Sequence, residues 1–341
     1  MAASSTASAV FPAEWAPHAA TWFTWPTNVD TWTNVMDPVR RRLAEAMKVI
    51  AEGEMVFVNV SSEEEAKEVH AYTDHHKNVI TLDLPSNDSW CRDHGTTFLL
   101  KGTELRAVTW HYNAWGGKYP PFDLDEEMGS RMAAKLGIRA VQSPITLEGG
   151  ALESNGEGIL LTTASCVLNP NRNPTLSKSQ AEEELIRQLG TPHIAWLEGD
   201  LEGDDTDGHI DNLARFVNAS TVLLPRSLAT KANLLALEDV GSRAGKVIQV
   251  DFLPEAASHS YQGDPLPCSH MNFLIANSCV ILPSYGGPSD QEASEILASY
   301  FPDKTIYALD CKDVIRGLGA IHCLTQQVPM FEGFKGLSNE I

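Results

Sequence analysis

Residues 37–60 read DPVRRRLAEAMKVIAEGEMVFVNV, a helical pattern followed directly by a strand pattern. The apolar residues of the first half recur at helical spacing and form one stripe: Val39, Leu43, Met47 and Ile50. Asp37 followed by Pro38 is typical of a helix start, with Asp37 as the cap, and Gly53 is typical of a helix end. The apolar run that follows predicts a buried strand over 55–60.

Similar patterns recur along the whole chain. Further helices are predicted at 62–71, 125–136, 177–189, 229–240 and 289–299. The helix at 177–189 opens with a capping box formed by Ser177 and Gln180. Other short strands are predicted at 79–84, 97–100, 105–110, 159–163, 221–224, 247–253, 273–275 and 279–282. Strands that alternate with helices predict an α/β protein built from repeated units.

The domain organisation follows from the absence of breaks in composition. Residues 1–10 are mostly small or polar, and we expect them to form a disordered tail. From residue 11 to residue 335 no linker or low-complexity tract divides the chain. We therefore expect a single domain over 11–335.

The composition excludes several classes of protein. With 45 acidic and 25 basic residues the net charge is −20, which argues against a nucleic-acid partner and favours small cationic ligands. No apolar run reaches the ~18–20 residues of a membrane helix, so no membrane partner is expected. The six cysteines form no CxxC or zinc-type spacing, which predicts no metal site and a reduced, cytoplasmic environment.

Polar residues that could carry chemistry gather in four segments that we expect to be loops: 87–95, 147–150, 204–212 and 317–327. In the third segment, an extended chain would project His209 and Asp211 to the same side, as a general acid/base beside a cation anchor. A buried histidine with a purely structural role is the alternative interpretation. A calcium loop is excluded, because its twelfth ligand position would fall on Ala214.

The fourth and first segments each allow two interpretations. Cys323 lies among apolar neighbours and is either a buried structural thiol or a nucleophile with its histidine upstream. Gly317 and Gly319 permit close approach of the backbone to a ligand. In the first segment, Trp90 and Asp93 are either a core aromatic and a surface ion-pair partner or parts of a binding site. Together, the acidic, histidine and cysteine side chains suit chemistry on a cationic carbon centre.

The combination of landmarks resembles the agmatine deiminases of the pentein, or guanidino-group-modifying, superfamily. The resemblance runs from about Pro12 to Pro329, and its landmarks are NDSWCRD at 87–93, NAWGGKY at 113–119, LEGG at 147–150, LNPNRNP at 168–174, DGHIDN at 207–212 and IHCLTQQ at 321–327. It implies the pentein fold, a five-bladed α/β-propeller of ββαβ-like units with pseudo-fivefold symmetry. It also implies a homodimer.

The resemblance further implies a reaction and the residues that perform it. The implied reaction is hydrolysis of agmatine, a small cationic guanidino substrate, to N-carbamoylputrescine and ammonia through a covalent thiouronium intermediate, with no metal or organic cofactor. The implied catalytic set is the nucleophile Cys323, the acid/base His209, Glu148 beside it, and the guanidinium-binding pair Asp93 and Asp211. The implied substrate-binding set is Trp90, Asp93, Asp205, Asp211 and Trp115.

The landmarks leave other members of the superfamily open. The chain has Thr96 where the family usually has proline, and Leu318 where it usually has glycine. A deiminase of free or peptidyl arginine, an amidinotransferase, and a catalytically inactive guanidine- or polyamine-binding pentein therefore remain alternatives. No role is assigned to Cys91, His94 or His322.

Overall fold

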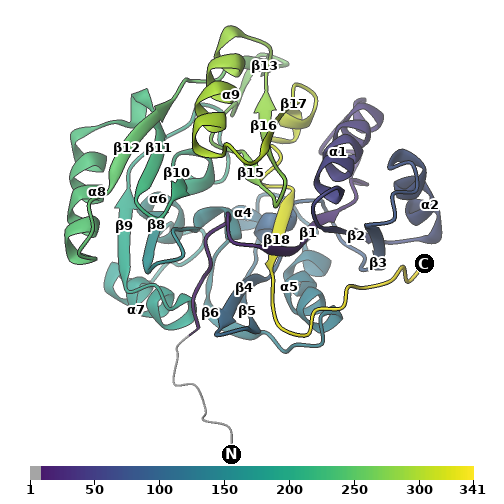
Figure 1. Ribbon diagram of the computed structural model, residues 1–341, viewed down its shortest axis with the longest axis horizontal. Coiled ribbons are helices and arrows are strands. Elements are labelled where there is room, and N and C mark those ends of the chain that lie inside the picture. Colours follow the sequence, from purple (N-terminus) through teal and green to yellow (C-terminus); the bar gives the residue numbers. More distant parts are fainter. Residues whose placement is uncertain (1–8) are drawn as a thin grey trace, which may run out of the picture.

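The computed structural model describes residues 9–341, and its strands repeat one pairing order (Figure 1). Within these residues, five sheets each begin with an antiparallel pair and continue with a parallel strand. The first sheet has the order β18 (Thr325–Pro329), β1 (His18–Thr24), β2 (Met55–Val60) and β3 (Val79–Asp83). The others are β4 (Thr97–Lys101), β5 (Glu104–His111) and β6 (Val141–Thr146); β7 (Glu153–Ser154), β8 (Ile159–Thr163) and β9 (His193–Leu197); β10 (Arg215–Asn218), β11 (Thr221–Pro225) and β12 (Gln249–Leu253); and β15 (Leu274–Ile275), β16 (Cys279–Ser284) and β17 (Thr305–Asp310).

A helix joins the two parallel strands of each sheet, and these helices lie toward the periphery of the molecule in Figure 1. They are α1 (Met36–Ala51), α5 (Asp123–Lys135), α7 (Lys178–Leu189), α8 (Lys231–Arg243) and α9 (Pro288–Tyr300). The remaining elements are α2 (Glu63–Tyr72), the short helices α3 (Cys91–His94), α4 (Ala114–Gly117) and α6 (Ala164–Val167), and the hairpin β13 (His259–Tyr261) and β14 (Asp264–Leu266). The predicted α/β class is therefore confirmed.

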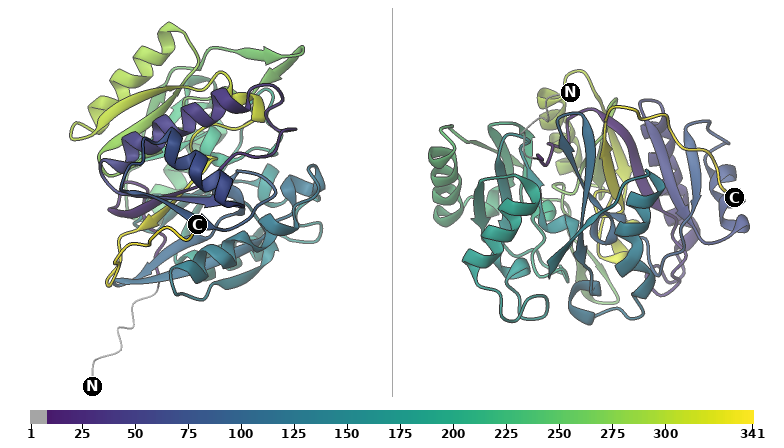
Figure 2. Two further views of the ribbon diagram at one scale, coloured as in Figure 1. Left: turned by 90° about the vertical axis from the view of Figure 1, so that its right-hand side faces the viewer. Right: turned by 90° about the horizontal axis from the view of Figure 1, so that it is seen from below.

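The two ends of the described chain meet in the first sheet. Strand β18 pairs with β1 from Thr325 opposite Phe23 to Pro329 opposite His18. The C-terminal segment then runs on beside β2 and β3 (Figure 2), where the N–H of Glu340 donates to a backbone oxygen of β3. Residues 1–8 of the predicted tail lie outside the described residues, and Val10 pairs with Leu100 of β4.

Helix α1 shows how the sequence pattern becomes packing. All four residues of its predicted stripe are fully buried: Val39, Leu43, Met47 and Ile50. The predicted cap is wrong, because the helix begins one residue before Asp37 and no side chain caps it. Asp37 instead lies in the first turn, where its charge favours the positive end of the helix dipole. In α7 the predicted capping box of Ser177 and Gln180 is present, and the helix ends at Gly190 with φ 65°.

All four predicted loops contain part of a short regular element. Residues 91–94 form α3, and 325–327 belong to β18. Residues 149–151 form a 3-10 turn. In the acidic segment, residues 210–212 also form a 3-10 turn, so the extended conformation that would project His209 and Asp211 to the same side is not present. In this turn the two side chains contact different partners: His209 lies beside Glu148, and Asp211 accepts a hydrogen bond from His322.

The site is supplied by the connections from one sheet to the next. The segments 84–96, 147–152, 198–214, 254–273 and 311–324 each leave one sheet and enter another. They include the four polar segments of the sequence. Because each connection begins and ends in a hydrogen-bonded strand, the sheets on either side fix the position of its two ends.

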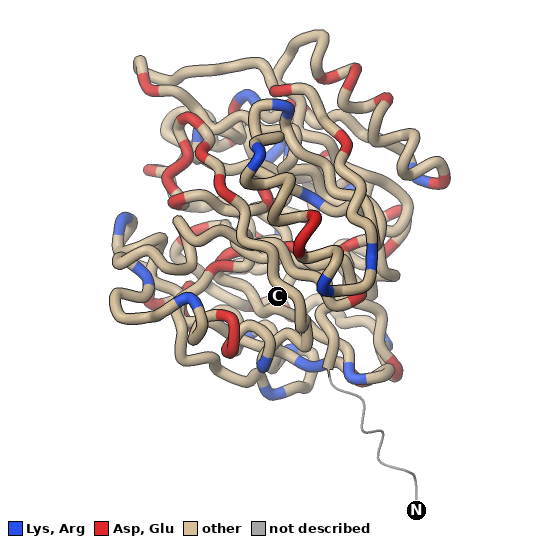
Figure 3. Tube along the Cα trace, turned by 90° about the vertical axis from the view of Figure 1, so that its left-hand side faces the viewer, with Lys and Arg blue, Asp and Glu red and all other residues tan. Residues whose placement is uncertain are grey.

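Charge is spread over the surface of the protein. Figure 3 shows acidic and basic positions interspersed along the trace on one face, without a separate basic patch there. Among residues 9–341, we find no helix that combines the length and apolar character needed to cross a bilayer.

Packing of α1 gives a first prediction. Leu43→Ala removes a fully buried side chain and should lower the free energy of unfolding by about 2–5 kcal/mol in chemical denaturation. The control, Leu235→Ala on α8, removes a side chain that is 51% exposed and should change it by less than about 0.5 kcal/mol. Equal losses in the two variants would contradict the described burial of α1.

Candidate active site

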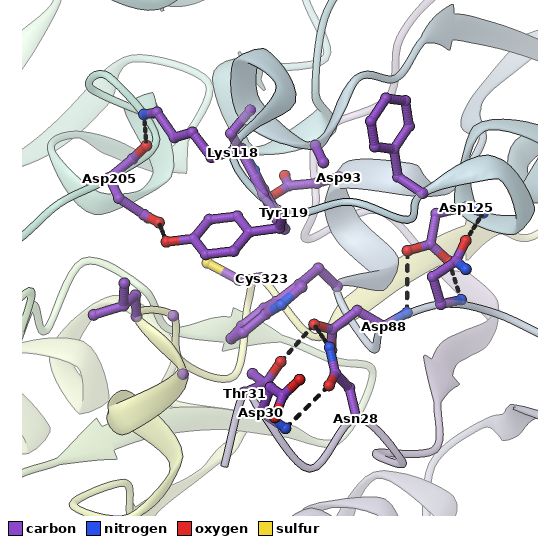
Figure 4. Close-up of a pocket in the computed structure, with 18 of the residues that line it drawn as sticks. Asn28, Asp30, Thr31, Asp88, Asp93, Lys118, Tyr119, Asp125, Asp205 and Cys323 are labelled. Carbon is purple, nitrogen blue, oxygen red and sulfur yellow. Dashed lines mark hydrogen bonds between the residues drawn. The ribbon is translucent and has the colours of Figure 1, made fainter. Parts of the chain in front are cut away.

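A cavity of about 680 Å³ lies among the connections between the sheets (Figure 4). Its wall is drawn mainly from segments 27–31, 87–93, 112–122 and 316–323. Of the residues predicted to form the site, the ones that line the cavity are Trp90, Asp93, Trp115, Asp205 and Cys323. The others, which are fully buried behind the wall, are Glu148, His209 and Asp211. The structure therefore gathers the predicted residues around one space.

The sulfur of Cys323 is held between an amide and a carboxylate. Nδ2 of Asn272 donates a hydrogen bond to Sγ at 3.0 Å, and Oδ2 of Asp211 lies 3.7 Å from Sγ. Burial raises the pKa of the Cys323 thiol well above its ordinary value, and the charges of Asp211 and Asp93 raise it further. With an empty cavity the side chain is therefore a thiol rather than a thiolate.

Asp211 presents one free oxygen. Its Oδ2 accepts a hydrogen bond from Nδ1 of His322 at 2.7 Å, whereas its Oδ1 is buried and has no hydrogen-bond partner. Burial alone would raise the pKa of Asp211, but the contact with His322 holds it below its ordinary value, so the group is ionised. A buried acceptor without a donor costs about 1–3 kcal/mol, so Oδ1 is suited to receive an N–H from a ligand.

Asp93 is the second carboxylate beside the thiol. The N–H of Gly150 donates to its Oδ1 at 3.0 Å, and Nε1 of Trp115 donates to its Oδ2 at 3.0 Å. Burial raises the pKa of Asp93 to about 6, and the negative charges of Asp211 and Glu148 contribute in the same direction. Asp93 is therefore an anion at neutral pH that would be stabilised by a cation.

Two glycines are required by the close packing of these groups. A side chain at Gly150 would place Cβ 2.5 Å from Nδ1 of His209 and 2.8 Å from Oδ1 of Asp93. A side chain at Gly319 would place Cβ 2.4 Å from the ring of Trp90. Glycine in the LEGG landmark and before the cysteine therefore makes room for the functional side chains themselves.

His209 is a fully buried ring between two carboxylates. Its Nε2 lies 3.3 Å from Oε2 of Glu148, and its Nδ1 lies 3.7 Å from Oδ1 of Asp93 without forming a hydrogen bond. Burial alone would lower the pKa of His209, but Asp93 and the hydrogen bonds around Nε2 hold it well above its ordinary value. Nε of Arg172 donates to Glu148 at 2.8 Å and keeps that carboxylate oriented. The ring is therefore an imidazolium that can give up a proton.

Cys166 is a second thiol at this histidine. Its Sγ donates to Oε2 of Glu148 at 3.6 Å, and burial raises its pKa to about 11. One donor atom each from Cys166, Glu148 and His209 lie within 4.8 Å of one another, a spacing that a metal ion could use. The guanidinium of Arg172 already neutralises Glu148, so the geometry favours a hydrogen-bonded cluster that orients the imidazole.

One wall of the cavity combines aromatic rings with a carboxylate. The ring of Trp115 lies between those of Trp90 and Tyr119, at centroid distances of 6.4 and 5.7 Å. The hydroxyl of Tyr119 donates to the carboxylate of Asp205, as Figure 4 shows. Burial raises the pKa of Asp205 above its ordinary value, although Tyr119 and the nearby ammonium of Lys118 oppose the shift. Such a wall suits an aliphatic chain that ends in a positive charge.

Cationic side chains on the wall already have partners. Within residues 9–341, the Lys and Arg side chains that line the cavity are Lys118 and Arg316. Lys118 pairs with Asp207 at 3.2 Å. Nη2 of Arg316 donates to the backbone oxygen of Thr33 at 3.1 Å, and its guanidinium lies 3.9 Å from the ring centre of Tyr261. Of the nitrogen atoms of these two side chains, Nε of Arg316 is buried and has no hydrogen-bond partner.

Several residues of the site carried no recognisable signal in the sequence. Asn272 lies in the segment between the fourth and fifth sheets, which contains none of the landmarks. Arg172 lies in the LNPNRNP landmark but its contact with Glu148 could not be inferred from spacing. His322 precedes the thiol and was left without a role. Cys166 is a buried thiol like others in the core, and only its contacts distinguish it.

The whole chain is similar to known proteins. Residues 10–329 match the family model described as Porphyromonas-type peptidyl-arginine deiminase. A protein of Legionella pneumophila (strain Paris), provisionally named agmatine deiminase, is 36% identical over 329 residues, which cover 93% of this chain and 94% of that one. A solved agmatine deiminase of C. jejuni, a cysteine-to-serine variant with substrate bound, is 27% identical with TM-score 0.84, covering 94% of this chain and 96% of that one. An agmatine deiminase of Enterococcus faecalis is 29% identical with TM-score 0.84, again covering 94% and 96%.

The charge around Cys323 predicts its reactivity. Asp211→Asn removes the nearest negative charge and should lower the pKa of the thiol, so iodoacetamide should label Cys323 faster at pH 7.5. One pKa unit corresponds to about tenfold in thiolate population. The control, Asp205→Asn, removes a carboxylate of the same cavity that hydrogen-bonds Tyr119, and should have a much smaller effect. Labelling that is unchanged or slower in Asp211→Asn would contradict this account of the thiol, with peptide mass spectrometry locating the label.

Proposed function

The chain belongs to the Porphyromonas-type peptidyl-arginine deiminase family, and from that premise we propose that it hydrolyses agmatine to N-carbamoylputrescine and ammonia. Like the relatives named agmatine deiminase, it is an enzyme that hydrolyses C–N bonds. A covalent intermediate on Cys323 divides the reaction into two steps, and neither step uses a metal or an organic cofactor.

One observation carries the proposal. Asp93 and Asp211 are buried carboxylates beside one thiol, and Oδ1 of Asp211 has no donor. A guanidinium is a flat cation whose N–H groups form a fork, so two carboxylates can receive them in paired hydrogen bonds. The same cation lowers the pKa of the Cys323 thiol, and the substrate therefore helps to form the nucleophile that attacks it.

The first half of the reaction releases ammonia. The Cys323 thiol loses its proton to solvent, and the thiolate then forms a bond to the guanidinium carbon while the electron pair of the C=N bond moves onto nitrogen. The imidazolium of His209 then gives its proton to the departing nitrogen, the C–N bond breaks, and ammonia leaves. An S-alkylthiouronium remains on the sulfur, and Asp93 and Asp211 continue to hold its positive charge.

The second half releases the ureido product. Neutral His209 takes a proton from water while the water oxygen bonds to the thiouronium carbon. Collapse of this adduct breaks the C–S bond and returns the electron pair to Cys323, while the hydroxyl proton passes to solvent. Glu148, held by Arg172, keeps the imidazole oriented in both halves and stabilises its charged form.

The other end of the cavity supports a substrate that ends in an ammonium. Asp205 offers a carboxylate, and Trp90 and Trp115 offer apolar surface for the methylene chain. Lys118 is already paired with Asp207. One observation favours a second candidate, deimination of free or peptidyl arginine: Nε of Arg316 has no partner and could meet a carboxylate.

The remaining family expectations are proposals as well. We propose that residues 11–335 form one domain in which the five sheets are the blades of a propeller. The shared pairing order supports this, as does the convergence of the inter-sheet connections on one cavity. The homodimer and the cytoplasmic location remain predictions, which sedimentation and cell fractionation would test.

A substrate panel tests the proposed reaction. Ammonia release should show the highest kcat/KM with agmatine, compared with arginine and with a peptide ending in arginine. Cys323→Ser should release none. Asp205→Asn should raise the KM for agmatine about tenfold, equivalent to about 1.4 kcal/mol, whereas Asp30→Asn at an exposed point of the rim should change it little. A preference for arginine that Arg316→Gln removes would establish the second candidate instead.

The pKa of Asp93 predicts the acid limb of the pH profile. Asp93 binds the cation only when ionised, so kcat/KM for agmatine should fall about tenfold per pH unit below pH about 6. Asp205→Asn should retain this limb, because the titrating group is Asp93. A profile that stays flat down to pH 4.5, in a protein whose melting temperature shows it folded, would contradict the role of Asp93.

A further inference from the structure

His322, next to the nucleophile, joins two buried carboxylates. Its Nδ1 lies 2.7 Å from Oδ2 of Asp211 and its Nε2 lies 2.7 Å from Oε2 of Glu14. The ring is 1% exposed, so no water competes for either nitrogen. Since both partners are carboxylate oxygens, both contacts are attractive only when both ring nitrogens carry hydrogen. Neither His322 nor Glu14 takes part in the two proposed steps of the reaction.

Glu14 is itself fixed by partners from other parts of the chain. Nη2 of Arg215 donates to Oε2 at 2.8 Å, and the N–H of Ile275 donates to Oε1 at 2.6 Å. The pKa of Glu14 lies well below its ordinary value, because Arg215 and His322 outweigh the effect of burial. An ionised, immobilised Glu14 therefore stands directly behind the ring of His322.

The backbone of residue 322 also supports the thiol, through a contact that does not involve the ring. The N–H of His322 donates to Oδ1 of Asn272 at 3.0 Å, and Nδ2 of that amide donates to the sulfur of Cys323. Nδ1 of the ring also faces Oδ2 of Asp211, the oxygen 3.7 Å from the sulfur. His322 therefore fixes the direction of the free Oδ1 and offsets the charge closest to the nucleophile.

We propose that Glu14 and His322 form a buried positioning relay that aims Asp211 at the guanidinium and keeps the charge around Cys323 low enough for thiolate formation. The proposal rests on the proposed function and adds a contribution from residue 14, in the segment that precedes β1. The side chains of Glu14 and His322 touch no substrate, and they act through Asp211.

The chain provides a matched control. His18, the first residue of β1, is equally buried, with Nδ1 3.2 Å from Oε1 of Glu54 and Nε2 2.7 Å from the backbone oxygen of Glu14. That pair contacts none of the site residues Asp211, Asn272 and Cys323. A purely structural role for buried histidines therefore predicts the same result for His18→Gln and His322→Gln.

The test compares Glu14→Gln, His322→Gln, their double variant and His18→Gln. We expect His322→Gln to lower kcat/KM for agmatine by about 10- to 100-fold, the range found when a partner that orients a metal ligand is removed. Both a higher KM and a lower kcat should contribute, because Asp211 holds the cation before and during reaction. Glu14→Gln should lower kcat/KM in the same direction, and the double variant should be no worse than His322→Gln alone, since the two act in series. His18→Gln should stay within about twofold of the wild type.

Alkylation of Cys323 without substrate gives a readout independent of turnover. Glu14→Gln removes a negative charge, so a simple through-space effect predicts faster labelling by iodoacetamide. The relay predicts slower labelling, because the ring of His322 is no longer held where its N–H offsets the charge of Asp211. His322→Gln should also slow labelling.

If His322→Gln does not fold, Glu14→Gln decides: unchanged kcat/KM with unchanged or faster labelling overturns the relay. Fully additive losses in the double variant would overturn it too. If the wild type releases ammonia from no guanidine, the proposed function fails, and the labelling rates still test the relay.

Discussion

Two carboxylates buried beside one thiol are the constraint on which the rest of this structure depends. Like charges in a site poor in water repel one another and hold protons on neighbouring groups. The protein offsets Asp93 through His209 and Asp211 through His322, and both compensating rings are buried. Along the described wall, the side chains of Lys118 and Arg316 are engaged elsewhere. A cation that enters the cavity therefore neutralises the remaining negative charge of Asp93 and Asp211.

The fold brings these groups together by taking each functional side chain from a different connection between sheets. Asp93, Glu148, Asp211, Asn272 and Cys323 come from five successive connections, each anchored in strands on both sides. The pairing of β1 with β18 closes the first sheet and brings the segment of Glu14 to the segment of His322. The charges alternate outward from the cavity, from carboxylate to histidine to carboxylate to arginine, so each is stabilised by the next.

Sequence reasoning found the parts of the fold with strong local signals. The stripe of α1 and the capping box of α7 depend on neighbours three or four residues away, and both are confirmed. The strands that were not predicted include β1, β6, β9, β10, β17 and β18. Of these, VQSPIT of β6 and TQQVP of β18 lack the alternation or the apolar run that marks a strand. The site residues could be predicted because their motifs are distinctive, and in the structure they surround one cavity. Asn272 and Glu14 were missed because their partners are 51 and 308 residues away in the chain, and only the fold brings them together.

The most direct measurement of the central claim is the mass of the enzyme during turnover. Agmatine mixed with the enzyme and quenched in acid within milliseconds should yield a protein heavier by one substrate minus one ammonia. Fragmentation should place the added mass on Cys323, and the adduct should be absent in Cys323→Ser. Turnover that proceeds with no such adduct at any quench time, or with an adduct on another residue, would contradict a guanidinium held by two carboxylates for attack by this sulfur.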